Sequence, residues 1–273
     1  MENLRKSGKV YKYQVIPLVN SGKSSGAVEE LTKIMTNWGA YLDLYAHQAN
    51  DLFKGGESLF CQGSESMCVA SISSAVHREA PFAVSAIELP DPSKDTKSGG
   101  TGRVDLWLCT GGHQFYIEGK LRRPSKKLSQ LRTTFVGNGK GSASSLISIG
   151  FRDYQKSTGT WSQIRRTTSE NYNRVMLLMI RFDYENDLEN LRGASEKLRE
   201  IFSSNEKIAI YRNHRTRKDA KPVLDSMNKY DHVALLMAPH GKIALDEEHN
   251  RGFIAVASII QTPRDILDSG RAG

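Results

Sequence analysis

Hydrophobic and polar positions alternate along two neighbouring segments in the middle of the chain, residues 102–109 and 113–121. Alternation with a period of two is typical of strands that bury one face. Gly111-Gly112 lies between the segments and suits a two-residue hairpin turn, because such turns require positive φ angles. The pattern therefore predicts a β-hairpin whose apolar face consists of Val104, Leu106, Leu108, Phe115 and Ile117.

A turn at these two glycines also predicts the register of the hairpin. It places Asp105 opposite Glu118 and Arg103 opposite Lys120, all on the polar face. Side chains at opposed positions have Cβ atoms about 4.5–5.5 Å apart, and like charges there are destabilising. We therefore expect positive charge between the two acids. A divalent cation such as Mg²⁺ is one candidate, and a basic side chain in an ordinary solvated hairpin is the other.

The remaining pattern predicts an alternation of helices and strands. Helical spacing predicts helices over 28–53, 64–79, 142–155 and 188–202, and apolar or alternating runs predict strands over 9–19, 82–89, 174–181 and 232–238. Ser64 is the expected N-cap of the second helix. Its expected packing face consists of Met67, Ala70, Ser71, Ser74 and Ala75. These elements indicate an α/β fold.

Asp105, twelve intervening residues and then Glu118-Gly119-Lys120 resemble the D…(D/E)-x-K signature of the PD-(D/E)xK, or restriction-endonuclease-like, nuclease superfamily. The order helix, three strands, helix, strand over roughly residues 57–183 is similar to the core of that family. The resemblance implies a mixed central sheet flanked by helices. It also implies that Asp105 and Glu118 bind Mg²⁺, with Mn²⁺ as a substitute, and that Lys120 helps to position and activate water for phosphodiester hydrolysis. Val104 stands where the family name has Pro, at a position that varies.

Members of this superfamily often add an acidic residue from the first core helix. The resemblance therefore implies Glu65 as a further catalytic residue, with Glu57, Glu79 and Glu88 as competitors. A carboxylate in the first turn of a helix also stabilises the helix dipole without any metal. Both roles of Glu65 stay open.

The charge of the chain favours a polyanionic partner. The net charge is +8, and no Asp or Glu occurs between Lys120 and Arg152. This basic stretch follows the predicted acidic site directly and suits contacts with a phosphate backbone. The expected nucleic-acid-binding residues are Arg122, Arg123, Lys126, Lys127, Arg132 and Lys140. DNA is favoured over RNA as the partner, and a non-catalytic nucleic-acid-binding protein on the same fold is the main alternative.

Other motifs are weaker. Gly22-Lys23-Ser24 is similar to the end of a phosphate-binding P-loop, but Pro17 stands where that motif needs its first glycine and lacks an N–H group. Because of this mismatch, a nucleotide hydrolase ranks only third among the hypotheses. The chain contains no run of about 20 apolar residues, which a membrane-spanning helix would need. The three cysteines are odd in number and do not have the spacing of a zinc site, which favours reduced thiols and a cytoplasmic protein.

The domain organisation is predicted from the same elements. Residues 1–56 form an N-terminal strand and long helix extension, 57–268 the nuclease-like core with C-terminal additions, and 269–273 a tail. Many nucleases of the resembled class cut two strands by pairing two sites. The sequence thus predicts a homodimeric, Mg²⁺-dependent endonuclease of restriction or defence type.

Overall fold

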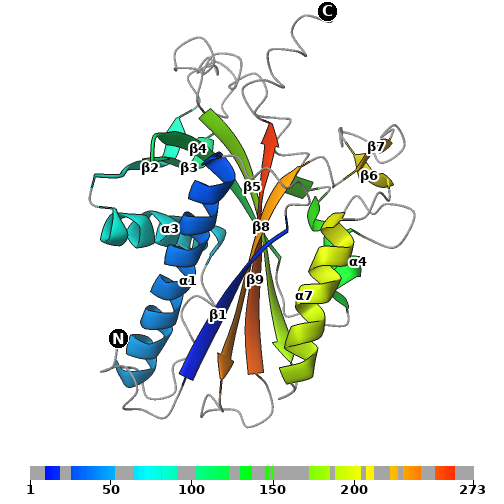
Figure 1. The fold of residues 1–273 in the computed structure, drawn as a ribbon, viewed down its shortest axis with the longest axis horizontal. Coiled ribbons are helices and arrows are strands. Elements are labelled where there is room, and N and C mark those ends of the chain that lie inside the picture. Colours follow the sequence, from blue (N-terminus) through cyan, green and yellow to red (C-terminus); the bar gives the residue numbers. More distant parts are fainter. Residues whose placement is uncertain are drawn as a thin grey trace, which may run out of the picture.

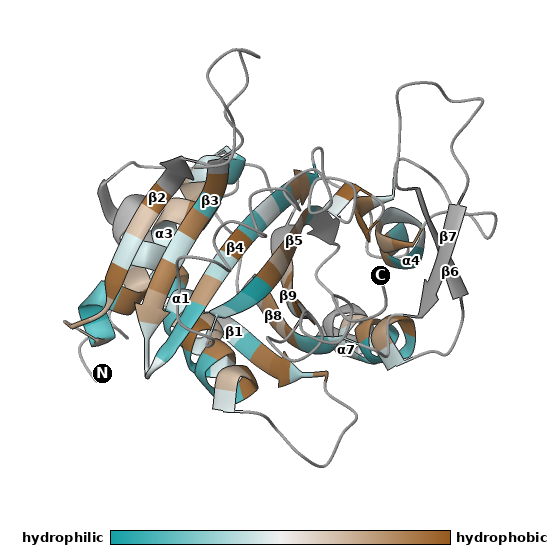
Figure 2. Ribbon diagram, turned by 90° about the horizontal axis from the view of Figure 1, so that it is seen from above, coloured by the Kyte–Doolittle hydropathy of each residue, from teal (hydrophilic) through white to brown (hydrophobic). Residues whose placement is uncertain are grey.

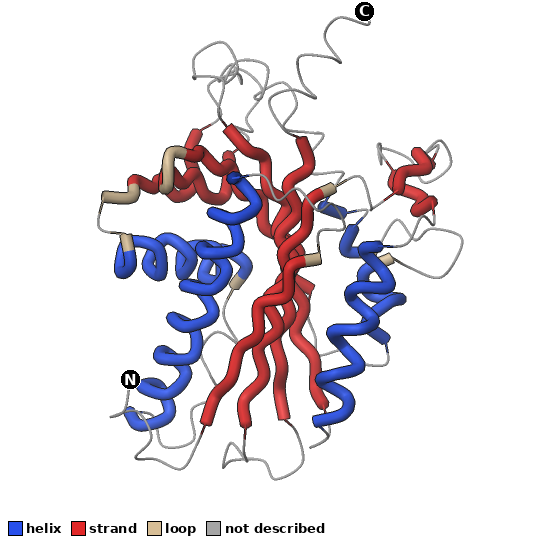
Figure 3. Tube along the Cα trace, viewed as in Figure 1, coloured by secondary structure: helices blue, strands red, loops and turns tan. Residues whose placement is uncertain are grey.

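The structure, a computed structural model, describes residues 10–18, 26–52, 64–80, 82–90, 103–122, 130–136, 145–147, 149–150, 172–184, 188–203, 207–211, 222–226, 230–240 and 250–261. Its centre is a seven-stranded mixed sheet with helices on both faces (Figures 1 and 3). The α/β class and the mixed sheet flanked by helices are therefore as predicted.

The elements follow one another along the chain as β1 (Val10–Pro17), α1 (Gly26–Leu52), α3 (Glu65–Glu79), β2 (Val84–Pro90), β3 (Arg103–Thr110), β4 (His113–Arg122), α4 (Leu131–Phe135), β5 (Tyr172–Tyr184), α7 (Leu188–Ser203), β6 (Lys207–Tyr211), β7 (Pro222–Ser226), β8 (Asp231–His240) and β9 (Asn250–Gln261). The strand order is β1-β8-β9-β5-β4-β3-β2, and β6 pairs with β7 in a separate two-stranded sheet. Only β4 and β5 are parallel; the other neighbouring strands of the large sheet are antiparallel.

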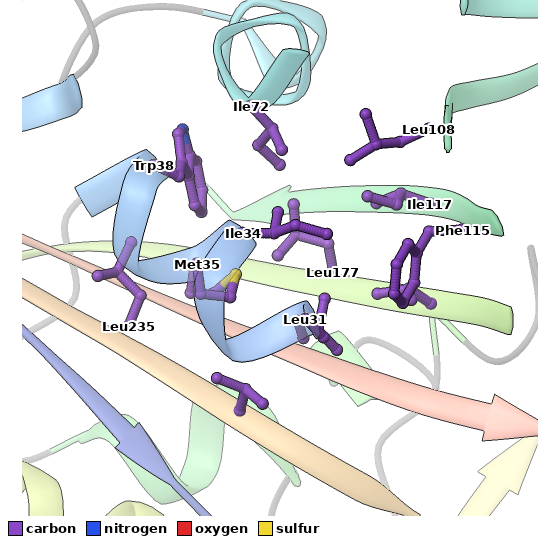
Figure 4. Packing of buried hydrophobic residues seen from close by; sticks show 14 of the residues in the cluster. Leu31, Ile34, Met35, Trp38, Ile72, Leu108, Phe115, Ile117, Leu177 and Leu235 are labelled. Carbon is purple, nitrogen blue, oxygen red and sulfur yellow. The ribbon is translucent and has the colours of Figure 1, made fainter. Parts of the chain in front are cut away.

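Helices α1 and α3 cover one face of the sheet (Figure 1). Apolar residues that recur at helical spacing along α1 are buried, among them Leu31, Met35 and Trp38 (Figure 4). The indole N–H of Trp38 donates a hydrogen bond of 2.7 Å to Ser71 Oγ on α3, so the two helices are joined by a polar contact inside an apolar cluster. Burial of the apolar side of α1 against the sheet explains why a long amphipathic helix forms here.

Helices α4 and α7 cover the opposite face. Leu198 and Ile201 of α7 are buried, as predicted from their helical spacing. Helix α4 lies within the basic stretch, where no helix was predicted. Its apolar residues Leu131 and Phe135 are four positions apart and both are buried in the same cluster, which is sufficient reason for a short helix at that point.

The hairpin turn is as predicted. Gly111 and Gly112 have φ angles of 57° and 76°, and Thr110 pairs with His113. The turn lies against the first turns of α1, where Thr110 Oγ1 donates a hydrogen bond of 3.1 Å to Glu30 Oε1. Glycine is needed at position 111 for two reasons, the positive φ angle and the carboxylate of Glu30, which fills the space that a Cβ would take.

Three side-chain orientations differ from prediction. On α3, Met67 and Ser74 are exposed, whereas the buried residues include Cys68, Val69 and Ile72. Ser71 and Ala75 are buried as predicted, so the face that packs is shifted around the helix from the predicted one and includes the larger side chains of Val69 and Ile72. On β3, Val104 does not join the cluster under the hairpin. It packs instead with an aromatic group on the other face, Tyr116, Tyr172 and Trp107.

The N-terminal strand and helix are parts of the same sheet and core. β1 pairs with β8, and α1 packs over the sheet beside α3. Strand β9, between β8 and β5, was not predicted, although the apolar run from Phe253 to Ile260 is typical of a buried strand. Of the helix predicted over 142–155, the structure describes a helical turn at 146–147 and 149–150, and the rest lies outside the described residues.

Candidate functional site

The two strands of the hairpin pair along only part of their length. The pairs run from Thr110–His113 to Leu106–Ile117, with the predicted register, and stop there. Asp105 and Glu118 would form the next pair, and that direct pairing is not observed. The predicted pairing of Arg103 with Lys120 is likewise absent from the ladder. We call the region beyond Leu106–Ile117 the open end of the hairpin.

At the open end, backbone N–H groups of β4 lose the partner that β3 provides elsewhere. Alternate residues of a strand direct their N–H groups to the same edge, so Gly119 and Leu121 both face the missing neighbour. A buried N–H without an acceptor costs free energy comparable to a lost hydrogen bond. Two carboxylates supply the acceptors here.

Asp105 is the first of these acceptors. Its Oδ2 accepts a hydrogen bond of 2.7 Å from the backbone N–H of Gly119, the residue between Glu118 and Lys120. Asp105 is therefore held next to the two other residues of the predicted motif, although through the backbone of β4 and not by cross-strand pairing.

Glu65 is the second acceptor, and it comes from another element. It is the first residue of α3, whose N-cap Ser64 accepts a hydrogen bond of 3.2 Å from the N–H of Met67. Glu65 Oε2 accepts a hydrogen bond of 2.7 Å from the N–H of Leu121. The helix dipole favours a carboxylate at this position, and the strand edge holds it in place.

Lys120 joins the acids. Its Nζ lies 3.2 Å from Glu65 Oε1 and 3.5 Å from Glu118 Oε1. The side chains of Lys120 and Glu118 are 15% and 16% exposed and that of Glu65 is 35% exposed, so these charges interact with less solvent screening than a surface pair. The structure thus brings Glu65, Glu118 and Lys120 into contact, with Asp105 one residue away along β4.

Gly119 makes this close arrangement possible. A Cβ at position 119 would lie 2.6 Å from Cγ2 of Val69 on α3 and 3.3 Å from Cε of Met179 on β5. Only glycine lets α3 approach β4 this closely, and that approach places Glu65 at the strand edge. The role of Gly119 was missed from the sequence, although a single glycine inside a strand pattern is a signal for close approach of another element.

The donor set can be tested against a hard divalent cation. Carboxylate oxygens are the ligands that Mg²⁺ prefers, and Mg²⁺ commonly uses one or two carboxylates together with water and substrate phosphates. The position between Glu65 and Glu118 already accommodates the positive charge of Lys120. Within the described ranges no three His, Cys, Asp or Glu side chains lie close enough together to hold a metal ion. Asp105 and Glu118 would therefore supply two carboxylates at most, and water or phosphate would have to complete the ligand set of a cation.

The competing acids lie elsewhere or are not described. Glu79 is at the other end of α3, where its Oε1 lies 3.4 Å from Arg78 Nε. The side chain of Glu88 and the whole of Glu57 are outside the described residues. Of the acids considered from the sequence, Glu65 is the one whose described contacts include the motif.

The predicted nucleic-acid-binding residues are described only in part. Arg122 is the last residue of β4 and is half-buried, two positions after Lys120. Arg132 is exposed on α4. The other four residues of that prediction are outside the described part of the chain: Arg123, Lys126, Lys127 and Lys140.

A tyrosine lies on the same strand as the acidic site. Tyr116 precedes Glu118 by two residues and meets Tyr172 edge to face, with ring centroids 5.7 Å apart. Burial, followed by the electrostatic effect of Tyr172, raises the pKa of Tyr116 to about 12. Tyr116 therefore keeps its proton at neutral pH and is not a candidate for a general base.

Comparison with known proteins adds no assignment. No family model matches the chain, and no match is found among curated proteins or among solved structures. Among the helices of the described ranges, none combines the length and the apolar character needed to cross a bilayer.

Proposed function

We propose that the protein is a Mg²⁺-dependent endonuclease that hydrolyses phosphodiester bonds, with DNA as the favoured substrate. The observation that carries this proposal is the meeting of Glu65, Glu118 and Lys120 at the open end of the hairpin, beside Asp105. The resemblance to the PD-(D/E)xK signature supports the same reading, and so does the mixed sheet flanked by helices. A restriction-endonuclease-like core and a cytoplasmic location are parts of this proposal.

Asp105 and Glu118 are the proposed ligands of the metal. When bound, Mg²⁺ supplies positive charge that stabilises the anionic transition state and makes water a better nucleophile near neutral pH. Asp105 is suited to this role because the N–H of Gly119 fixes one of its oxygens. The N–H of Gly119 occupies only that oxygen, Oδ2, and each carboxylate oxygen has more than one lone pair.

Lys120 is the proposed charge-stabilising residue. Its ammonium group is a donor, and it can form hydrogen bonds with the attacking water or with a phosphate oxygen as negative charge develops. Glu65 contacts Lys120 at 3.2 Å and would hold the ammonium in place while a substrate competes for it. Glu65 is thus a positioning residue in this proposal.

The second candidate is a non-catalytic nucleic-acid-binding protein on the same fold. One specific observation favours it: Asp105 and Glu65 both accept hydrogen bonds from the edge of β4, which is a structural task. The net charge of +8 would serve binding equally well in either case. The two candidates differ in what a charge-neutral replacement of Asp105 does.

The test compares the wild-type protein with Asp105→Asn and with Glu79→Gln. Supercoiled plasmid, single-stranded DNA and RNA are incubated with each protein in Mg²⁺, Mn²⁺ or EDTA. Asparagine retains an oxygen that can accept from Gly119 N–H but loses the negative charge. Glu79→Gln removes one charge of the same sign from the exposed far end of α3 and is the matched control.

The endonuclease proposal expects metal-dependent cleavage by the wild-type protein and by Glu79→Gln, and loss of cleavage by at least about a hundredfold in Asp105→Asn with nucleic-acid binding retained. Binding by all three proteins without cleavage of any substrate would instead support the second candidate. Cleavage that Asp105→Asn leaves unchanged would remove the site from consideration.

A further inference from the structure

The two edges of the large sheet expose different side chains. At one edge, the exposed residues on β1 whose side chains are described are Gln14 and Pro17. At the other edge, β2 exposes Val84 at 54% and Ile87 at 48%, and Phe82 just before it is 97% exposed. Three of the four exposed large hydrophobic residues in the described part of the chain therefore belong to one segment, 82–90, which we call the β2 edge.

An edge strand presents unpaired N–H and C=O groups that can pair with another chain. Natural proteins protect such edges with charges, bulges or proline, and both edge strands of this sheet end on a proline, Pro17 in β1 and Pro90 in β2. β2 hydrogen-bonds to β3 on one side, and no described strand pairs with its outer side (Figure 2). A proline at the last position leaves the earlier backbone groups of β2 able to pair.

We propose that the β2 edge is a dimer interface, at which β2 pairs antiparallel with β2 of a second copy of this chain. This inference does not depend on the proposed nuclease activity. A twofold axis makes the same surface meet itself, so each unpaired backbone group of one β2 meets its complement on the other. The two seven-stranded sheets then become one continuous sheet.

The low charge of the β2 edge makes it a place where two copies of this chain can meet. Two copies with a net charge of +8 repel each other, and contact costs least where each contributes little charge. The β2 edge contains one charged residue, Glu88. The neighbouring end of α3 carries Arg78 and Glu79 side by side at 3.4 Å, so it adds no net charge to the contact.

The size of the edge sets the expected affinity. A strand of seven residues spans about 23 Å at roughly 3.3 Å per residue. Strand pairing over that length with a few apolar side chains is small beside a standard interface of about 1,600 Å². We therefore expect a dissociation constant in the micromolar range, about 1–100 µM, and not an obligate dimer.

Sedimentation equilibrium or light scattering between about 1 and 300 µM protein tests the proposal, with the wild-type protein and three variants. Val84→Lys and Ile87→Lys each place a charge on the β2 edge at an already exposed position, on opposite faces of the strand. Met67→Lys is the matched control, because Met67 is 43% exposed but lies on α3, outside this edge. Circular dichroism and thermal unfolding verify that each variant is folded.

The wild-type protein and Met67→Lys should dimerise with similar dissociation constants, and each β2-edge variant should weaken dimerisation by at least about tenfold. A wild-type protein that stays monomeric throughout the range would overturn the inference. So would a dimer that tolerates both β2-edge variants, or one that Met67→Lys weakens to the same extent.

Discussion

The two ends of the β3–β4 hairpin meet their hydrogen-bonding requirements in opposite ways. At the turn end, backbone pairs with backbone up to Thr110–His113, and Gly111-Gly112 reverses the chain. At the open end, pairing stops and the carboxylates of Asp105 and Glu65 accept from the N–H groups that β3 no longer serves. No Asp, Glu, Lys or Arg is among the paired residues at the turn end. At the open end, by contrast, Glu65, Glu118 and Lys120 are in contact beside Asp105.

The difference teaches where chemistry can arise in a hairpin. A fully paired strand has no backbone group left to orient a side chain, so its polar residues face solvent. A strand that loses its neighbour needs acceptors, and acidic side chains that supply them are held in place and partly shielded from water. The turn end should therefore govern stability, and the open end should govern activity.

The largest expected effect is at the open end. Lys120→Met should lower cleavage by about a hundredfold to a thousandfold, because it removes the ammonium group proposed to stabilise the transition state. Rates are measured under single-turnover conditions, with binding followed by fluorescence anisotropy. Lys33→Met is the control, since Lys33 also lies 3.4 Å from a glutamate but is 71% exposed on α1. An equal loss in both variants would contradict the assignment.

The turn end should respond in stability. Gly111→Ala combines a strained positive φ angle with displacement of the Glu30 carboxylate and loss of its hydrogen bond from Thr110, so we expect it to lower the free energy of unfolding by roughly 2 kcal/mol. Gly112→Ala has the strained φ angle alone, because no atom lies within 4 Å of its Cβ, and should cost about 1 kcal/mol. Urea unfolding measures both, and cleavage per folded molecule should not change. Equal costs would show that the contact with Glu30 is unimportant.

Glu65→Gln should have an intermediate effect on activity. Glutamine retains an oxygen that can accept from the N–H of Leu121 but loses the charge that holds Lys120. We expect cleavage to fall about tenfold, with a change in stability of less than about 1 kcal/mol. A pH–rate profile adds a readout that a purely structural role would not move. A fall in stability of several kcal/mol with normal cleavage per folded molecule would assign Glu65 to the fold alone.

The smallest effect is expected in α1, the helix that contacts the turn. Asp43 Oδ1 is buried and has no hydrogen-bond partner among the described residues, and burial raises the Asp43 pKa from 3.8 to about 6. Its carboxyl binds its proton more tightly in the folded state, so the contribution of Asp43 to stability is fully present below about pH 4 and is lost as pH rises through about 6.

Asp43→Asn should therefore stabilise the protein by about 1 kcal/mol at pH 8, a figure reduced because the side chain is partly exposed, and should have no such effect at pH 4. Urea unfolding at the two pH values gives the difference between variant and wild-type protein. Cleavage at pH 8 should be the same for both. A variant less stable than the wild-type protein at pH 8 would show that the Asp43 carboxylate has a partner.

The turn end could be predicted from the sequence almost completely. Two glycines and a period of two determined its register, because both signals are local. The start of helix α3 also followed from a local signal, the N-cap Ser64, whereas Glu65 was singled out by the resemblance to the nuclease superfamily. The open end did not follow, because a sequence pattern does not show where pairing stops. Val104 has the same alternation as Leu106, yet it packs on the other face.

Packing between distant segments accounts for the other differences. The burial of Val69 and Ile72, and the need for Gly119, depend on how closely α3 crosses β4, and residues more than forty positions apart determine that distance. Strand β9 was recognisable as an apolar run, but its place between β8 and β5 is a property of the whole sheet.

The central claim is that Asp105 and Glu118 bind a divalent metal ion at the open end of the hairpin. A crystal of the protein grown with Mn²⁺ tests it directly through anomalous scattering. The claim predicts an anomalous peak within about 2.3 Å of an oxygen of both carboxylates, with Lys120 displaced from Glu118 or sharing it. A well-ordered open end with Lys120 between Glu65 and Glu118, and no peak there at saturating Mn²⁺, would contradict it.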